Sequence, residues 1–511
     1  MGETEWAADQ LSARLARIEA QLAQIALLTD AETINTSRQV QHSLLRYCAN
    51  TVPGYWLRTM PPAAAKRAAR EHDDRIAEVA AEVFDFDPST AVGGRAARQL
   101  RLPTSMGGMG LTSCADIAPA AFVGSLSAFL APIVRLCPRL AEPCEQPGDS
   151  ALPTIATVAA ELATISHLRA QLETTWRQWD AAAISHDCNG DALFRWHPEE
   201  LPTALELPCL ALLTTHRKKP DETYDHAQRA LSRVLHHQRW LALFKELGSD
   251  REYVRFISAS QPLAGACFNA VPSRADFRID SAELLVMAQR RLGLPLSCMR
   301  GIEYSQQLGR EVDQLGDVFL TFHNHSKRHN GVVGVLARAA RQALNAKVQT
   351  EDMQHEVYSP GARPDVRIRL RTRKFKLLEV KVLCPISSNP GLTGHAGTYA
   401  AFANTAPAKR EEVAAKYAPA KINGHDVTPC VFEVFGSAAP EVMQLLEDWG
   451  RAARSKTPPG EEPPWSARNF IPYWSQLLSK EAQRGAAIEI LNRVDGEAAD
   501  REAARLRSAG S

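Results

Sequence analysis

Asp365, Glu379 and Lys381 are the residues of this sequence whose types best suit chemistry on a phosphate ester. Two carboxylates about 4 Å apart repel each other strongly unless a divalent cation lies between them. Oxygen ligands of this kind, completed by water molecules, suit Mg²⁺ or Mn²⁺. Such an ion would lower the pKa of a bound water and neutralise a phosphodiester, while Lys381 orients or activates that water. These residues therefore predict a hydrolytic site with Asp365 and Glu379 as metal ligands.

A β-hairpin would bring these side chains together. Apolar and basic residues alternate from Val366 to Arg371, which predicts a strand with one buried face. A polar turn near Thr372 and a second apolar strand from Phe375 would complete the hairpin. Antiparallel pairing then places Asp365 opposite the stretch from Glu379 to Lys381. An acid at the start of one strand and Glu-x-Lys on the next form the PD-(D/E)xK nuclease pattern.

Basic residues crowd around this predicted hairpin, as a phosphate backbone would require. Strands also expose Arg and Lys to keep their edges from pairing, which is an equally simple explanation for each residue alone. The net charge of the whole chain is only +1, so any nucleic-acid surface must be local. The candidate nucleic-acid contacts are Arg328, His329, Arg363, Arg367, Arg369, Arg371, Arg373 and Lys374.

Composition and length describe an ordinary globular protein. The 511 residues suffice for about two to four domains with apolar cores. The 10 cysteines include no CxxC pair, which favours buried free thiols in a reducing compartment. No apolar run approaches the length of a membrane span, and the N-terminus lacks the pattern of a signal peptide. We therefore expect a soluble intracellular protein without a membrane partner.

Helical periodicity dominates the first half of the chain. Leu11, Leu15, Ile18, Leu22 and Ile25 recur at alternating spacings of four and three residues within a predicted helix over about residues 5–28. Another helix is predicted from Ser281 to Leu292. The pattern predicts an α+β multidomain protein with a mostly helical N-terminal half, followed by a small α/β domain.

Several stretches, in the correct order, resemble the C-terminal part of the polyprotein of non-LTR retrotransposons that carry a restriction-like endonuclease. The resemblance covers about residues 40 to 450 in separate pieces. These pieces are Leu44–Asn50, Leu57–Pro62, Arg101–Leu111, Ala118–Phe122, Arg291–Leu296, Gly316–Asp317, Arg328–Asn330, Arg363–Asp365, Glu379, Lys416–Tyr417 and Phe432–Gly436.

The resemblance implies four segments. Residues 1–290 would form a helical thumb-like and linker region, 291–330 a degenerate zinc-knuckle-like segment, 331–450 a restriction-endonuclease-like domain, and 451–511 a linker and helical tail. Glu356 would supply a further acid, Lys381, Lys409 and Lys416 compete for the role of catalytic lysine, and Tyr417 matches a tyrosine that often follows it. The polymerase palm is absent, so this chain is not expected to synthesise DNA.

The family's zinc knuckle is altered here. Cys298 matches the first cysteine of the knuckle, but the residue in place of its nearby partner is Arg300. Val318 and Phe322 occupy two later ligand positions. Cys298, His323, His325 and His329 could form an improvised four-ligand zinc set. A metal-free loop is the favoured interpretation.

The resemblance favours a Mg²⁺-dependent endonuclease that nicks target DNA in the nucleus, with element RNA as a further partner. A non-catalytic remnant that binds nucleic acid is the main alternative, and the altered knuckle supports it. A decayed element copy without a maintained role is a third interpretation. The Asp365, Glu379 and Lys381 set favours the enzyme, because a pure binder has no use for acids that repel phosphate.

Overall fold

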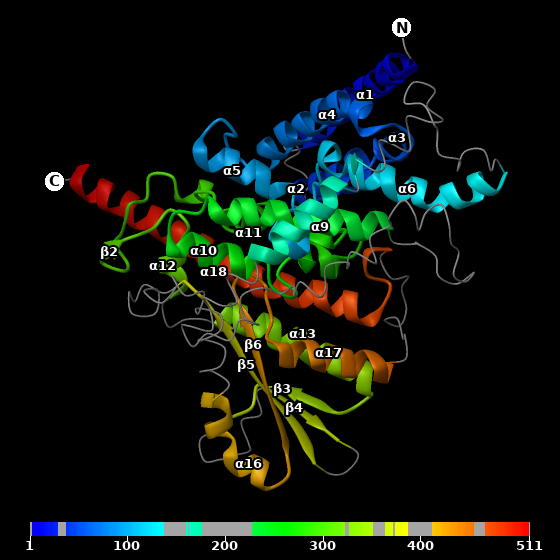
Figure 1. Ribbon diagram of the computed structural model, residues 1–511. Coiled ribbons are helices and arrows are strands. Elements are labelled where there is room, and N and C mark those ends of the chain that lie inside the picture. The colour runs from blue at the N-terminus through cyan, green and yellow to red at the C-terminus, as the bar shows by residue number, and fades with distance from the viewer. Residues whose placement is uncertain are drawn as a thin grey trace.

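The computed structural model shows a mostly helical protein with a small mixed sheet in its C-terminal half, which confirms the α+β prediction (Figure 1). No helix in the described part of the chain combines the length and apolar character needed to cross a membrane. The structure describes residues 3–28, 37–136, 160–161, 163–175, 227–321, 326–350, 363–370, 374–386, 411–453 and 465–509.

The N-terminal helices α1 (Glu3–Leu27) and α4 (Pro62–Val83) pack along each other (Figure 1). Ile18, Leu22 and Ile25 of the predicted seam are buried in this contact. Pro62 begins α4, where its missing N–H removes no helical hydrogen bond. An apolar stripe at helical spacing thus fixes the first layer of the fold.

Further α-helices, a short π-helix, several 3-10 turns and a two-stranded sheet complete the helical part. The predicted helix from Ser281 to Leu292 is confirmed as α11, with Asp280 as its N-cap and Gly293 in the left-handed conformation at its end. The other elements are α2 (Ser37–Leu44), η2 (Leu45–Ala49), α3 (Gly54–Thr59), α5 (Ala91–Leu100), η3 (Thr104–Met106), α6 (Cys114–Leu136), α9 (Ala227–Lys245), α10 (Asp250–Ala259), η7 (Ala266–Asn269), η8 (Ala275–Phe277), η9 (Ser297–Met299), β1 (Tyr304–Ser305), β2 (Arg310–Glu311) and α12 (Asp317–Leu320).

Within the described residues the main sheet has four strands, in the order β3 (Val348–Thr350), β4 (Val366–Arg369), β5 (Phe375–Leu383) and β6 (Asp426–Glu433). The pairs β3–β4 and β4–β5 are antiparallel, whereas β5 and β6 are parallel. Val366 lies opposite Leu378 and Arg369 opposite Phe375, which confirms the predicted hairpin. Its predicted turn, with Arg371 and Arg373, lies outside the described residues.

Each face of this sheet is covered by helix. Val366, Ile368, Leu378 and Val380 are buried on one face, against α13 (Ser326–Leu344) and α17 (Pro440–Ala453). On the other face Leu377 packs with residues 411–422, which include α16 (Ala418–Ile422). On that second face the side chains of β4 are less covered, since Arg367 is half-buried and Arg369 is exposed. The alternation of β4 follows from this difference between its two faces, because successive side chains point to opposite sides.

The long helix α18 (Phe470–Ala509) connects the helical part to the sheet domain. It runs across the middle of the molecule, and α13 and α17 lie between it and the sheet (Figure 1). Leu477 and Leu478 are buried, and one continuous apolar cluster extends from Ile18 to Ile490. A 3-10 turn, η11 (Trp465–Ala467), precedes the helix. The part of α18 from Phe470 to Ile490 therefore belongs to the core.

Candidate active site

Asp365 precedes β4 and makes two contacts that fix its carboxylate. Its Oδ2 accepts a hydrogen bond from the backbone N–H of Val380 at 2.6 Å. Its Oδ1 lies 3.2 Å from Nε2 of His329, which α13 supplies near its start. This hydrogen bond raises the pKa of His329 above its usual value, so protonated imidazole is favoured beside the acid.

Glu379 lies in the middle of β5 and is almost fully buried. Two ammonium groups reach its Oε1, Lys381 Nζ at 2.9 Å and Lys416 Nζ at 2.8 Å. The hydroxyl of Tyr417 donates to its Oε2 at 2.7 Å. Burial is tolerated here because each carboxylate oxygen has a charged or hydroxyl donor.

These contacts also affect the ionisation of the donors. Burial lowers the pKa of Lys381, but its hydrogen bond to Glu379 and the nearby carboxylates outweigh that effect and raise the pKa overall. Burial, reinforced by Glu379, raises the pKa of Tyr417 far above its usual value. Lys381 therefore stays a cation and Tyr417 a hydrogen-bond donor at neutral pH.

The two acids approach each other across the hairpin. Continuing the register of β4 and β5 places Asp365 opposite Glu379, and the residue after Glu379 donates to Asp365. The negative charge of Asp365 contributes to the raised pKa of both Lys381 and Tyr417. The structure thus brings together Asp365, Glu379, Lys381, Lys416 and Tyr417 of the predicted catalytic set. Glu356 and Lys409 lie outside the described residues.

The donor chemistry of this cluster fits Mg²⁺. That ion binds through one or two carboxylates and completes its shell with waters and phosphate oxygens, and Asp365 and Glu379 are two such carboxylates. Among the described residues, no group of three or more His, Cys, Asp or Glu side chains is arranged to hold a metal ion. An ion held by this pair would replace part of the present contacts of Lys381, Lys416 and His329.

The zinc set predicted near residue 298 is only partly described. Cys298 is half-buried, and burial raises the pKa of its thiol to about 11, which disfavours the thiolate that zinc requires. His329 contacts Asp365 instead. His323 and His325 lie outside the described residues.

Carboxylates hold residues 305–318 in place through backbone hydrogen bonds. Glu497 of α18 is fully buried and accepts hydrogen bonds from the backbone N–H groups of Gln306 at 2.9 Å and Gln307 at 3.1 Å. Asp313 likewise accepts from the N–H groups of Asp317 and Val318. The sequence analysis missed both acids, because their partners are backbone groups that sequence patterns do not mark.

The predicted nucleic-acid contacts occupy different environments. Arg328 is buried, donates to the carbonyl of Leu320 and lies 3.6 Å from Glu489, so it holds parts of the protein together. Arg367 bonds to Gln349 and lies over the ring of Phe375. Exposed side chains belong to Arg363, Arg369 and Lys374, whereas Arg371 and Arg373 lie outside the described residues.

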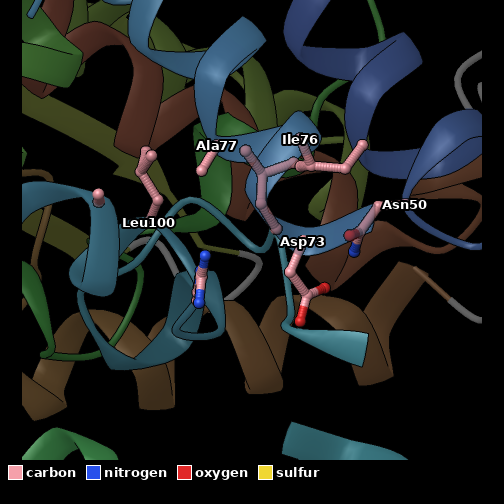
Figure 2. A pocket seen from close by; sticks show the side chains of 8 residues that line it. Asn50, Asp73, Ile76, Ala77 and Leu100 are labelled. Carbon is pink, nitrogen blue, oxygen red and sulfur yellow. The ribbon is translucent and has the colours of Figure 1, made fainter. Parts of the chain in front are cut away.

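A small cavity elsewhere is structural. It lies between α4 and α5, and Asp73 and Asn50 are among the residues that line it (Figure 2). Asp73 accepts hydrogen bonds from the hydroxyl of Ser113 and the N–H groups of Cys114 and Ala115. The N–H groups of Cys114 and Ala115 have no acceptor within the first turn of α6, so Asp73 caps that helix by accepting from them. The cavity has room for about one water molecule.

Comparison with known proteins does not identify the chain: no family model matches it, and no curated protein matches it.

Proposed function

We propose that this protein is a metal-dependent endonuclease that nicks DNA, and that residues 331–450 form its PD-(D/E)xK domain. The observation that carries the proposal is the placement of Asp365 against the N–H of Val380, the residue between Glu379 and Lys381. The mixed sheet with helices on both faces supports it further. The proposed origin in a non-LTR retroelement rests on the ordered resemblance described above.

In the proposed reaction a water oxygen attacks phosphorus, and the bond to one bridging ester oxygen breaks as the new P–O bond forms. The attacking water gives up a proton to solvent, and the leaving ester oxygen takes one up from solvent. Mg²⁺ or Mn²⁺ held by Asp365 and Glu379 would lower the pKa of the attacking water and neutralise the phosphate. Lys381 and Lys416 supply positive charge where negative charge develops on the phosphorane. Tyr417 keeps Glu379 oriented by its hydrogen bond.

Nicking of a supercoiled plasmid tests this proposal. Purified protein incubated with Mg²⁺ or Mn²⁺ is expected to produce the open circular form, and a chelator should stop the reaction. Asp365→Asn should abolish nicking, whereas Asp426→Asn should not. Asp426 is a suitable control because it lies on the same sheet, contacts a lysine at 2.6 Å and is half exposed. Equal nicking by wild type and Asp365→Asn would reject the assigned site.

A second function, binding of DNA or element RNA without cleavage, is favoured by one observation. All four carboxylate oxygens of Asp365 and Glu379 already have donors within the protein. Such a network is also what a purely structural ion cluster would show. A gel shift with plasmid DNA or RNA, without nicking in either metal, would support this binding function and exclude the enzyme.

A further inference from the structure

Helix α13 has one narrow solvent-facing line of residues. Between residues 327 and 341 the exposed positions are Lys327, Asn330, Gly334, Arg338 and Arg341, and every other position is buried or half-buried. Their spacings of three, four, four and three residues place them on a single face of the helix. We call this set the α13 stripe.

The stripe carries positive charge and no acid, because α13 contains no Asp or Glu. The acids that face it come from neighbouring elements and have cations of their own. Asp276 accepts from Tyr473 and lies 3.7 Å from Arg274, closer than the 4.0 Å to Arg338 of the stripe. From α18, Glu481 pairs with Lys480, and Glu489 pairs with the buried Arg328. The field at the stripe is therefore positive.

The side chains of the stripe remain available to a ligand. The Arg338 side chain is 47% exposed although it also approaches Asp276. Arg341 makes a 3.4 Å contact with the carbonyl of Val348, which leaves most guanidinium donors unused by that bond. A Cβ built on Gly334 would meet no atom within 4 Å, so the middle of the stripe is open.

Length and position match a nucleic-acid backbone. From Lys327 to Arg341 the helix extends about 21 Å, a distance over which one strand of B-DNA presents about six phosphates. His329 contacts Asp365, so the candidate site lies at the end of α13 where the stripe begins, although His329 itself is on a different face of the helix from the stripe. A duplex lying along the stripe would therefore have to pass around the start of α13 to reach Asp365 and Glu379.

We infer that the α13 stripe binds the phosphate backbone of double-stranded DNA next to the site of cleavage. Lys327, Arg338 and Arg341 contact phosphates, Asn330 donates a neutral hydrogen bond, and Gly334 lets the sugar-phosphate chain approach the helix closely. The choice of DNA as the partner rests on the proposed function. These contacts carry no sequence information and fix the register of the duplex on the protein.

A matched pair of substitutions at Gly334 tests the inference. Both Gly334→Ala and Gly334→Glu favour the helix over glycine, so both proteins should remain folded. Only Gly334→Glu places a negative charge in the stripe. Fluorescence anisotropy with a labelled duplex should show about tenfold weaker binding for Gly334→Glu and an affinity within about twofold of wild type for Gly334→Ala. Equal affinities for the two variants would overturn the inference.

Salt dependence provides a second readout. Each phosphate contact contributes about 0.9 to the slope of log K against log salt. Replacing Lys327, Arg338 and Arg341 with Gln should make the slope less negative by about 2 to 3. The control replaces Arg67, Arg75 and Arg451, all exposed cations on α4 and α17, and should keep the wild-type slope. Identical slopes for the stripe variant and wild type would contradict the inference.

The failure of this inference can be told apart from the failure of the proposed function. A protein that nicks DNA but binds it equally well without the stripe cations contradicts the inference alone. Stripe-dependent duplex binding without nicking supports the inference and excludes the enzyme. Binding of poly-glutamate but not of duplex DNA would overturn the inference and assign the stripe to an acidic polypeptide.

Discussion

The backbone N–H of Val380 lies 2.6 Å from Oδ2 of Asp365 and donates a hydrogen bond to it. This bond crosses from β5 to the start of β4 and ties the position of one acid to the strand that carries the other. Because Glu379 and Lys381 flank Val380, the geometry of the whole cluster depends on the register of the hairpin. A slip of one residue would turn Glu379 toward the opposite face.

Lys381 and Lys416 share one oxygen of Glu379, which predicts a non-additive effect on nicking. Lys381→Met and Lys416→Met should each lower the rate by about 100-fold, since each removes one cation from the developing charge. The double variant should lose less than the product of the two effects, because the groups act on one carboxylate. Rates of plasmid nicking measure this. Strict multiplication of the two losses would show that the lysines act separately.

Tyr417 stabilises the folded protein through its bond to buried Glu379. Tyr417→Phe removes the hydroxyl and keeps the ring in its contacts with Leu377 and Val413. We expect the free energy of unfolding to fall by about 2 kcal/mol, as for other hydrogen bonds to charged groups. Urea denaturation measures the change, and an unchanged midpoint would mean that the two lysines alone satisfy Glu379.

Glu433, at the end of β6, predicts a stability that falls as the pH rises. It is buried, accepts from the hydroxyls of Ser258 and Ser437, and burial raises its pKa from 4.5 to about 7. The folded protein therefore binds more protons than the unfolded chain between these values. The stability that protonated Glu433 contributes is complete below pH 4.5 and is lost as the pH rises through 7. The free energy of unfolding should fall by about 3 kcal/mol over this range.

Glu433→Gln tests this prediction, because the amide cannot ionise. Unfolding free energies measured from pH 5 to pH 8 should vary less with pH in this variant than in wild type. The exposed Glu447, replaced in the same way, should leave the wild-type pH dependence unchanged. A wild-type protein equally stable at both pH values would contradict the assignment.

Asp317 neutralises two buried arginines at the junction of α10, α11 and α12. Its carboxylate is fully buried and lies 2.8 Å from Arg290 and 3.2 Å from Arg255. Asp317→Asn should cost about 3 to 5 kcal/mol of stability, because both guanidinium groups lose their counter-charge in the interior. Denaturant unfolding measures this loss. Glu71→Gln, which breaks an exposed pair with Arg67, is expected to have no measurable effect.

Local patterns were sufficient to predict the elements that carry Asp365 and Glu379. Val366 and Ile368 are buried and Arg369 is exposed, so the alternation in the sequence reports the two faces of β4 directly. The helix from Ser281 to Leu292 was equally predictable, because Asp280 and Gly293 mark its two ends.

Contacts between distant elements were not predictable in this way. His329 was assigned to zinc or nucleic acid, and only the packing of α13 against the hairpin places it beside Asp365. Glu497 is 0% exposed, because the backbone of a distant hairpin satisfies its carboxylate. A single sequence shows neither the partner nor the burial of such a group. The sequence was sufficient to predict which acids form the site, but not which groups donate hydrogen bonds to them.

Nicking by Glu379→Gln, compared with nicking by Glu433→Gln, tests the central claim most directly. Both substitutions exchange a buried glutamate for its amide, on the neighbouring strands β5 and β6. Only the first removes a charge that would hold the metal ion. We expect no open circular plasmid with Glu379→Gln and wild-type amounts with Glu433→Gln in Mg²⁺. Undiminished nicking by Glu379→Gln would contradict the central claim.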